Sequence, residues 1–202
     1  MSELNVLALL NALIGNTYID LSLYLKNPNL ISQRIISKYQ EWPQEGILNL
    51  ERRTAFNNAI KLMTEEECKL KAFESQSFEE RVIAYLMCGD GYSAMLECEN
   101  EGEFELATLV STAMGQSQEF KSNLKAQLTS GEIVSLNRFN DSISPATKQI
   151  LELIAGLNRE NNGEFSWKSN LGKVSWFNSH FDDPLHGVFT DFEKYVQPES
   201  LE

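Results

Sequence analysis

The chain has 202 residues, of which 42% are hydrophobic, and a formal net charge of −12. This composition argues against a disordered chain, and the acidic surface argues against direct binding to nucleic acid or to an anionic membrane. No apolar stretch is long enough to span a bilayer, and the first residues lack the basic start and cleavage site of a signal peptide.

The length fits one domain or a tightly joined pair. We expect a single helical scaffold domain over residues 1–200, cut from a longer protein, because a helical run starts almost at Met1. Leu201 and Glu202 match what a common cloning site leaves before a purification tag, so we expect both to be vector-derived. An odd number of cysteines without a CxxC pair favours a reduced compartment, the cytosol or the nucleus. They are Cys68, Cys88 and Cys98.

Helical signals begin at the N-terminus. Leu4–Ile14 carries apolar residues at helical spacing. Tyr18–Leu25 alternates like a strand, but its place between helices favours a helix. Asn27 and Pro28 then supply an N-cap and a first-turn proline for a helix that ends at Pro43.

Two capping boxes divide the next part of the chain. A helix over Leu48–Met63 is expected to stop where Thr64 and Glu67 form the first box. Ser77 and Glu80 form the second box and begin another helix. The sequence therefore predicts a break near residue 64 and a helix start near residue 78.

Glycine and proline mark the later helix boundaries. The helix after the second box stops at the turn 89–91, whose sequence is Gly-Asp-Gly, and the next helix closes near Gly102. Ser144 and Pro145 cap a further helix, whose inner face carries Ile150 and Ile154.

The best-organised segment is residues 103–128. An apolar stripe at helical spacing precedes Gly115, and a second run of apolar residues spaced by four follows it. The first stripe comprises Leu106, Leu109, Val110, Ala113 and Met114, and the second Phe120, Leu124 and Leu128. Two such helices with a short turn predict an α-hairpin without an obvious reactive group. With no strict repeat period, the sequence predicts an all-α fold, an irregular α-solenoid-like stack of antiparallel helical hairpins.

One segment near the C-terminus holds metal-ligand residue types. His180, Asp182, Asp183 and His186 offer two imidazoles and two carboxylates. The histidines are not four residues apart, and Pro184 prevents one helix from presenting both. Asp183 and Pro184 are more typical of a helix start. We therefore assign no metal, cofactor-binding or catalytic residue, since both histidines of the chain lie here and a Ser-His-Asp or Cys-His set is hard to assemble.

Aromatic residues gather in the same part of the chain, and most of them are expected in the core. They are Phe165, Trp167, Trp176, Phe177 and Phe181. Any that remain exposed are expected to anchor a protein interface, because Trp and Phe dominate binding hot spots. The candidates are Trp176, Phe177 and Phe181, which share a segment with polar residues.

Four segments together resemble one family. They are LNALIG at 10–15, LERRTAF at 50–56, FELATLVSTAMGQSQEFKSNLKAQL at 104–128, and DDPLHGVF at 182–189 after the FSW of 165–167. In this order they are similar to the helical domain of the coat nucleoporin released from the nucleoporin ninety-eight/ninety-six precursor. Its fungal counterpart is the C-terminal product of nucleoporin one-hundred-forty-five. Relatives are expected to carry a tryptophan shortly after the Gln-Leu that ends the third segment, where this chain has Thr129, Ser130 and Gly131.

The resemblance implies a helical fold of the ancestral coatomer element type, shared with vesicle-coat proteins. It implies a structural component of the Y-shaped coat subcomplex of the nuclear pore complex, in the nuclear envelope, that supports pore assembly and nucleocytoplasmic transport of protein and mRNA. The implied partners are a helical coat nucleoporin of the eighty-four/one-hundred-seven type and a β-propeller coat protein, the latter through regions outside this chain. The family has no catalytic residues to transfer.

Two other classes of function stay open from the sequence. One is a scaffold or adaptor of a vesicle coat on the same fold. The other is a metal-dependent enzyme that uses the segment from His180 to His186.

Overall fold

The computed structural model describes residues 44–115, 118–130, 143–157, 165–179 and 183–196. Within these ranges the regular secondary structure is all helical, with eight α-helices, one π-helix and no strand, which confirms the predicted all-α fold. None of the described helices is both long and apolar enough to cross a membrane. The helices expected over Leu4–Ile14, over Tyr18–Leu25 and after Asn27 lie outside the described residues.

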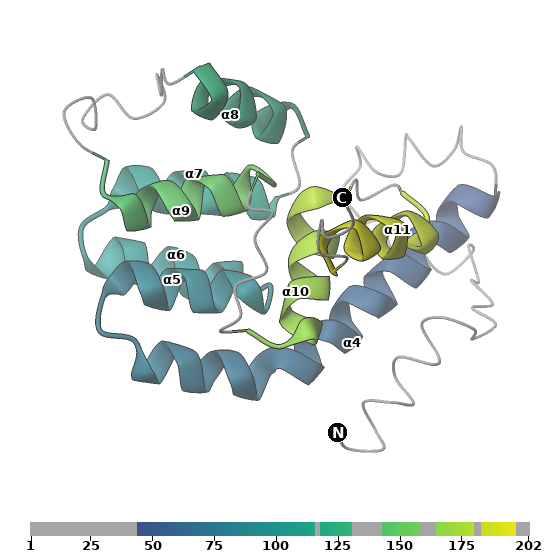
Figure 1. Ribbon diagram of the computed structural model, residues 1–202, viewed down its shortest axis with the longest axis horizontal. Coiled ribbons are helices and arrows are strands. Elements are labelled where there is room, and N and C mark those ends of the chain that lie inside the picture. The colour runs from purple at the N-terminus through teal and green to yellow at the C-terminus, as the bar shows by residue number, and fades with distance from the viewer. Residues whose placement is uncertain (1–43, 116–117, 131–142, 158–164, 180–182, 197–202) are drawn as a thin grey trace, which may run out of the picture.

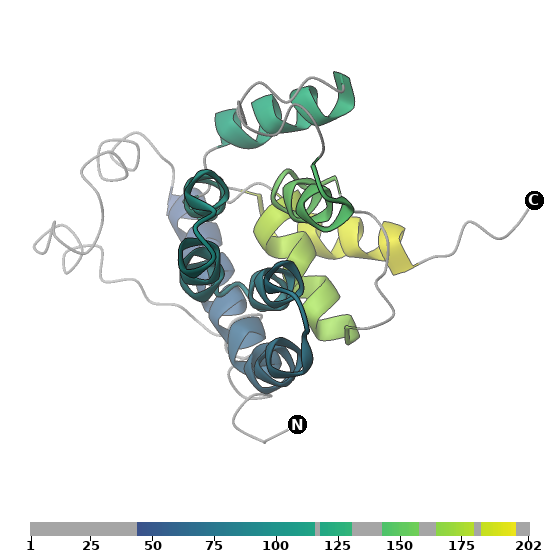
Figure 2. The same cartoon turned by 90° about the vertical axis from the view of Figure 1, so that its left-hand side faces the viewer.

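The helices are α4 (Gln44–Glu74), α5 (Phe78–Met87), α6 (Gly91–Asn100), α7 (Phe104–Met114), α8 (Gln118–Ser130), α9 (Pro145–Ile154), α10 (Trp167–Lys173), the π-helix η2 (Val174–Asn178) and α11 (Leu185–Val196). Consecutive helices from α4 to α7 pack side by side, and α9 returns to contact α5, α7 and α8. Figure 1 shows these helices stacked in one direction, with α10 running crosswise at the inner end of the stack. Figure 2 looks along the stacked helices and shows several of them end on. The arrangement is the irregular stack of helical hairpins that the sequence predicts.

Most of the local boundary signals act as predicted. The Ser77 hydroxyl accepts from the Glu80 amide and begins α5, while the Glu80 carboxylate accepts from the amide of Gln76. The Ser144 hydroxyl accepts from the Thr147 amide at the start of α9. At the end of α5, the amides of Gly89 and Asp90 donate to carbonyls of the last turn in a Schellman motif, with Gly89 at a φ of 70°.

The predicted break at Thr64 is wrong, because α4 continues without interruption to Glu74. Thr64 is fully buried, and its hydroxyl donates to the carbonyl of Ile60 at 3.0 Å instead of capping a new helix. No glycine or proline lies between Gly46 and Gly89, so nothing in the sequence stops the helix there. Figure 1 shows α4 changing direction along its length, and a hydroxyl bonded four residues back tends to bend a helix.

The segment 103–128 forms the two expected helices, α7 and α8, with α7 ending at Gly115. The apolar stripe of α7 is buried, as predicted, at Leu106, Leu109, Val110 and Ala113. In a simple hairpin, α7 and α8 would pack mainly on each other. Here α7 packs mainly on α6, whereas α8 lies against both α7 and α9.

The C-terminal helices close one side of the core. α10 packs against α4, and α11 contacts α10, η2 and α4. The Phe189 ring of α11 meets the Phe56 ring of α4 edge to face, with 5.6 Å between the ring centroids. This closure brings residues more than one hundred positions apart into contact around η2.

Candidate functional site

The most unusual part of the described structure is η2 and the side chains around it, which we term the η2 junction. The amide and the hydroxyl of Ser179 both donate to the Val174 carbonyl, five residues back, at 3.0 and 3.2 Å. This is the hydrogen-bond spacing of a π-helix, a form that is found mostly as single turns and often at functional sites. The last carbonyls of any helix need donors from outside it. At η2 those donors come from two buried cations.

Arg53 of α4 is the first of these cations. Its side chain is fully buried, and its Nη2 donates to the Ser175 carbonyl at 2.7 Å. A weaker contact of 3.5 Å joins Nη1 to the Asp183 carbonyl. Desolvation lowers the pKa of Arg53 to about 10, and the negative charge of Asp183 opposes this shift. Arg53 therefore ties α4 to η2 and to the chain that leads into α11.

Lys121 of α8 is the second cation, and it is 5% exposed. Its Nζ donates to the Trp176 carbonyl at 2.8 Å and lies 5.7 Å from the centroid of the Phe177 ring, within the range of a cation–π interaction. Desolvation lowers the pKa of Lys121 to about 8, and the positive charge of Arg53 lowers it further. Two like charges are thus held inside the protein by backbone carbonyls of the same short helix.

The indole of Trp176 fills a space between two glycines. A Cβ atom added to Gly172 would lie 2.5 Å from the ring, and one added to Gly89 would lie 2.8 Å from it. Gly89 ends α5 and Gly172 lies within α10. Because neither glycine has a side chain, the indole can pack against both the end of α5 and α10.

The structure therefore places two of the predicted interface residues in the core. Trp176 is 9% exposed and Phe177 is 3% exposed, so the expectation that these two rings are exposed is wrong. The rings are buried because Gly89 and Gly172 leave room for the indole and the Lys121 ammonium lies over Phe177. Phe181 lies outside the described residues.

A second polar cluster joins α4 to the start of α10. The Glu67 carboxylate accepts from the Ser166 amide at 2.6 Å, from the Ser166 hydroxyl at 2.5 Å and from the Ser169 hydroxyl at 2.8 Å. Desolvation alone would raise the pKa of Glu67, but the hydrogen bonds from Ser166 and Ser169 outweigh it and lower that pKa. Glu67 thus serves as a negative cap at the N-terminus of a helix formed one hundred residues later.

The described residues offer little for catalysis. No group of three or more His, Cys, Asp or Glu side chains within them is arranged to hold a metal ion. His186 is exposed on α11, while His180 and Asp182 lie outside the described residues. Pro184 immediately precedes α11, and its carbonyl accepts from the Gly187 amide, close to the predicted helix start.

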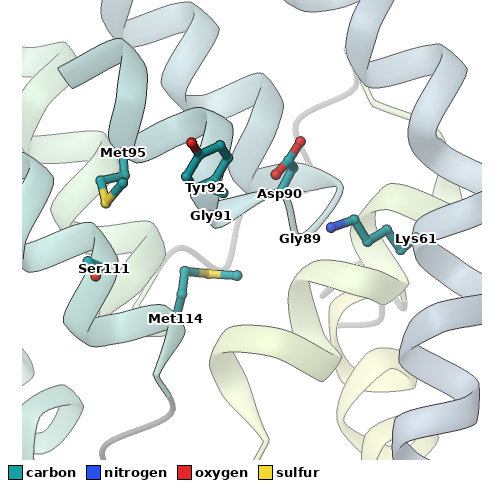
Figure 3. A pocket seen from close by; sticks show the side chains of 8 residues that line it. All are labelled: Lys61, Gly89, Asp90, Gly91, Tyr92, Met95, Ser111 and Met114. Atoms are coloured by element: carbon teal, nitrogen blue, oxygen red, sulfur yellow. The ribbon is translucent and has the colours of Figure 1, made fainter. Parts of the chain in front are cut away.

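An open cavity of about 310 Å³ lies between α4, α6 and the end of α7 (Figure 3). Its lining comprises Lys61, Gly89, Asp90, Gly91, Tyr92, Met95, Ser111 and Met114. The Asp90 carboxylate is already used as the N-cap of α6, where it accepts from the Ser93 amide and hydroxyl. Figure 3 shows Lys61 on one side of the cavity and the two methionines on the other. The cavity holds no set of converging polar groups of the kind that acid–base or nucleophilic catalysis requires.

Sequence reasoning missed Arg53, Lys121 and Glu67 as the groups that organise the η2 junction and its neighbour. Arg53 lies in the LERRTAF segment and Lys121 in the long third segment of the resemblance, but nothing local marks either as buried. Their partners lie 122 and 55 residues away along the chain.

Comparison with known families gives one match. The family model described as Nup96, nuclear protein 96, matches residues 80–202, more than half of the chain. The matched range takes in α6 to α11, including Lys121 and all of η2. No curated protein matches the chain. The Nup96 family is a family of structural nucleoporins, not of enzymes. The chain belongs to the Nup96 family, and it is therefore a nucleoporin, a component of the nuclear pore complex at the nuclear envelope.

Proposed function

We propose that this nucleoporin is a structural scaffold component of the Y-shaped coat subcomplex of the nuclear pore complex. In that role it supports pore assembly and, through it, nucleocytoplasmic transport of protein and mRNA. The single observation that carries the proposal is the family match over residues 80–202, which covers the helices that form most of the stack.

The way the helices pack supports a structural role. Consecutive helices bury their apolar stripes against each other and leave long outer faces for partners. Arg53 of α4 and Lys121 of α8 donate hydrogen bonds to η2, and Glu67 of α4 accepts one from Ser166 at the start of α10. These bonds join elements that lie far apart in the sequence. A rigid stack of this kind can hold two neighbours at a fixed separation.

We further propose two kinds of partner. The first is a helical coat nucleoporin of the eighty-four/one-hundred-seven type, which would bind the stack directly. The second is a β-propeller coat protein, bound through regions outside these 202 residues. We also infer that the chain is not an enzyme, and that its interactions carry its function.

Co-purification from a cell extract tests the proposal. The tagged chain is expected to retain coat nucleoporins and not the coat proteins of endoplasmic reticulum vesicles. The double variant His180→Ala/His186→Ala should retain the same partners, because a scaffold does not depend on those imidazoles. Recovery of vesicle-coat proteins alone would contradict the proposal in favour of the vesicle-coat alternative.

A further inference from the structure

The outer face of α4 carries an apolar stripe that no described residue covers. Leu62 is 55% exposed, Leu70 is 56% exposed and Phe73 is 88% exposed. With the exposed Glu66 and Lys69, these residues recur at intervals of three and four, so they share one face of the helix. In Figure 1 this part of α4 forms the lower edge of the stack, and no described helix lies beyond it.

We propose that this face binds a second copy of the chain, with the two α4 helices packed antiparallel about a two-fold axis. The axis would cross α4 at the level between Glu67 and Cys68. Leu62 of one copy would then lie level with Phe73 of the other, because both residues are equally far from that point along the helix. The same operation repeats the pair on the other side of the axis, as a two-fold interface requires.

The charges on this face fit the same register. Glu66 and Lys69 are also equally far from the axis, so each would lie level with the opposite charge on the second copy. Lys69 already forms an ion pair with Glu65 of its own helix, with 2.5 Å between Nζ and Oε1. Glu66 has no ion-pair partner among the residues that the structure describes. A parallel arrangement in register would instead set each charge level with itself, so the antiparallel one is favoured.

The small area of this face limits the expected affinity of the dimer. Two helices in contact over about three turns bury less than the roughly 1,200–2,000 Å² of a standard stable interface. The association should therefore be weak and concentration-dependent, with a Kd on the order of 10–100 μM. This inference does not rest on the proposed function, since it concerns copies of the same chain.

Sedimentation equilibrium over a range of about 1–500 μM, which brackets that Kd, tests the proposal. The mass is expected to rise from the 22.9 kDa of one chain towards twice that value. The double variant Leu62→Ser/Phe73→Ser should remain monomeric throughout. The matched control is Tyr92→Ser/Phe104→Ser, which removes two exposed aromatic side chains from other helices and should dimerise like the parent. Circular dichroism of all variants should be unchanged, because each of these side chains is more than half exposed.

A charge exchange tests the antiparallel register itself. Glu66→Lys sets lysine against lysine across the axis and should weaken the dimer at least fivefold. The double variant Glu66→Lys/Lys69→Glu restores opposite charges and should recover most of that loss. A parent that stays monomeric at the highest concentration would overturn the proposal, as would a dimer lost equally in the control variant. A charge exchange that fails to restore the dimer would overturn the register, and with it this surface as proposed.

Discussion

The indole of Trp176 occupies the space that a side chain on Gly172 would need. The two residues lie one helical turn apart where α10 runs into η2, and a Cβ atom on Gly172 would come within 2.5 Å of the ring and 2.9 Å of the Ile60 side chain. The ring therefore folds back along its own helix, as helical side chains do. The close approach of α10 to α4 depends on the missing side chain.

Gly172→Ala is expected to destabilise the protein by about 1–3 kcal/mol, because the added methyl group overpacks a buried site. Inside a helix the same substitution ordinarily stabilises by about 0.5–1 kcal/mol. The sign of the change is therefore the informative quantity. Urea unfolding measures it.

Gly187→Ala is the matched control for that experiment. Gly187 also lies inside a helix, α11, and the nearest atom to an added Cβ would be 3.9 Å away. This variant should be neutral or slightly more stable than the parent. If the two alanine variants behaved alike, the packing of Trp176 described here would be wrong.

Glu67→Gln should destabilise the protein by about 1–2 kcal/mol at neutral pH. The amide has one acceptor oxygen where the carboxylate has two, so at least one of the bonds from Ser166 and Ser169 is lost. The loss is modest because Glu67 is only partly buried and solvent screens its charge. Glu65→Gln, on the exposed surface of the same helix, should change the stability by less than about 0.5 kcal/mol.

The effect of Glu67→Gln should also depend on pH. The pKa of Glu67 is lowered in the folded state, so its stabilisation is present above the ordinary value of 4.5 and is lost as the pH falls through the lower folded pKa. The stability difference between the variant and the parent should therefore shrink in acid. A difference that stayed constant from pH 7 to pH 3 would contradict the assigned role of the carboxylate.

Lys121 should make stability rise between about pH 8 and pH 10.5. Its pKa falls from 10.5 to about 8 on folding, so in that interval the unfolded chain binds a proton that the folded protein has released. Stability rises with pH wherever the unfolded state binds more protons. The full gain is up to about 3 kcal/mol.

Lys121→Met removes this rise, whereas Lys125→Met, at an exposed position of the same helix, should keep it. Chemical unfolding at pH 7.5 and pH 10 of the parent and both variants gives the comparison. All other ionisable side chains are the same in the parent and in Lys121→Met, so their contribution cancels in the difference. Equal pH dependence of the parent and Lys121→Met would mean that the ammonium is not buried as described.

The local parts of this fold are readable from the sequence. Ser77 and Ser144 act within three residues of themselves, and Gly89 ends a helix through bonds to its own last turn. Such signals need no knowledge of the rest of the chain. Thr64 and Glu67 match the same capping pattern but lie inside α4, where the threonine is buried and bonds to Ile60 while the glutamate reaches Ser166. The pattern alone does not distinguish these two outcomes.

The η2 junction was not predictable in the same way. Arg53 and Lys121 look like surface residues of amphipathic helices, and only the arrival of η2 from far along the chain buries them. Trp176 has polar neighbours in the sequence, which suggested exposure, yet the space that accepts it is made by Gly89 and Gly172. Tertiary contacts of this kind override the local pattern.

Phe181 remains the member of the predicted interface that can be tested as a direct contact. Phe181→Ala is expected to weaken binding of the helical coat nucleoporin about tenfold, the loss of a hot-spot aromatic. Phe104→Ala, which removes an exposed ring of α7, should leave the binding unchanged. Trp176→Ala is unsuitable for this purpose, since it would empty part of the core. Equal affinity of Phe181→Ala and the parent in a titration would remove Phe181 from the interface.

The central claim is that this chain is a scaffold bound by other coat nucleoporins. The most direct measurement is the mass of the species formed with the helical coat nucleoporin of the eighty-four/one-hundred-seven type, by light scattering on a sizing column at low micromolar concentration. We predict a stable one-to-one complex. Separate elution of the two proteins, with the chain shown to be helical and folded by circular dichroism, would contradict direct binding of that partner by these 202 residues.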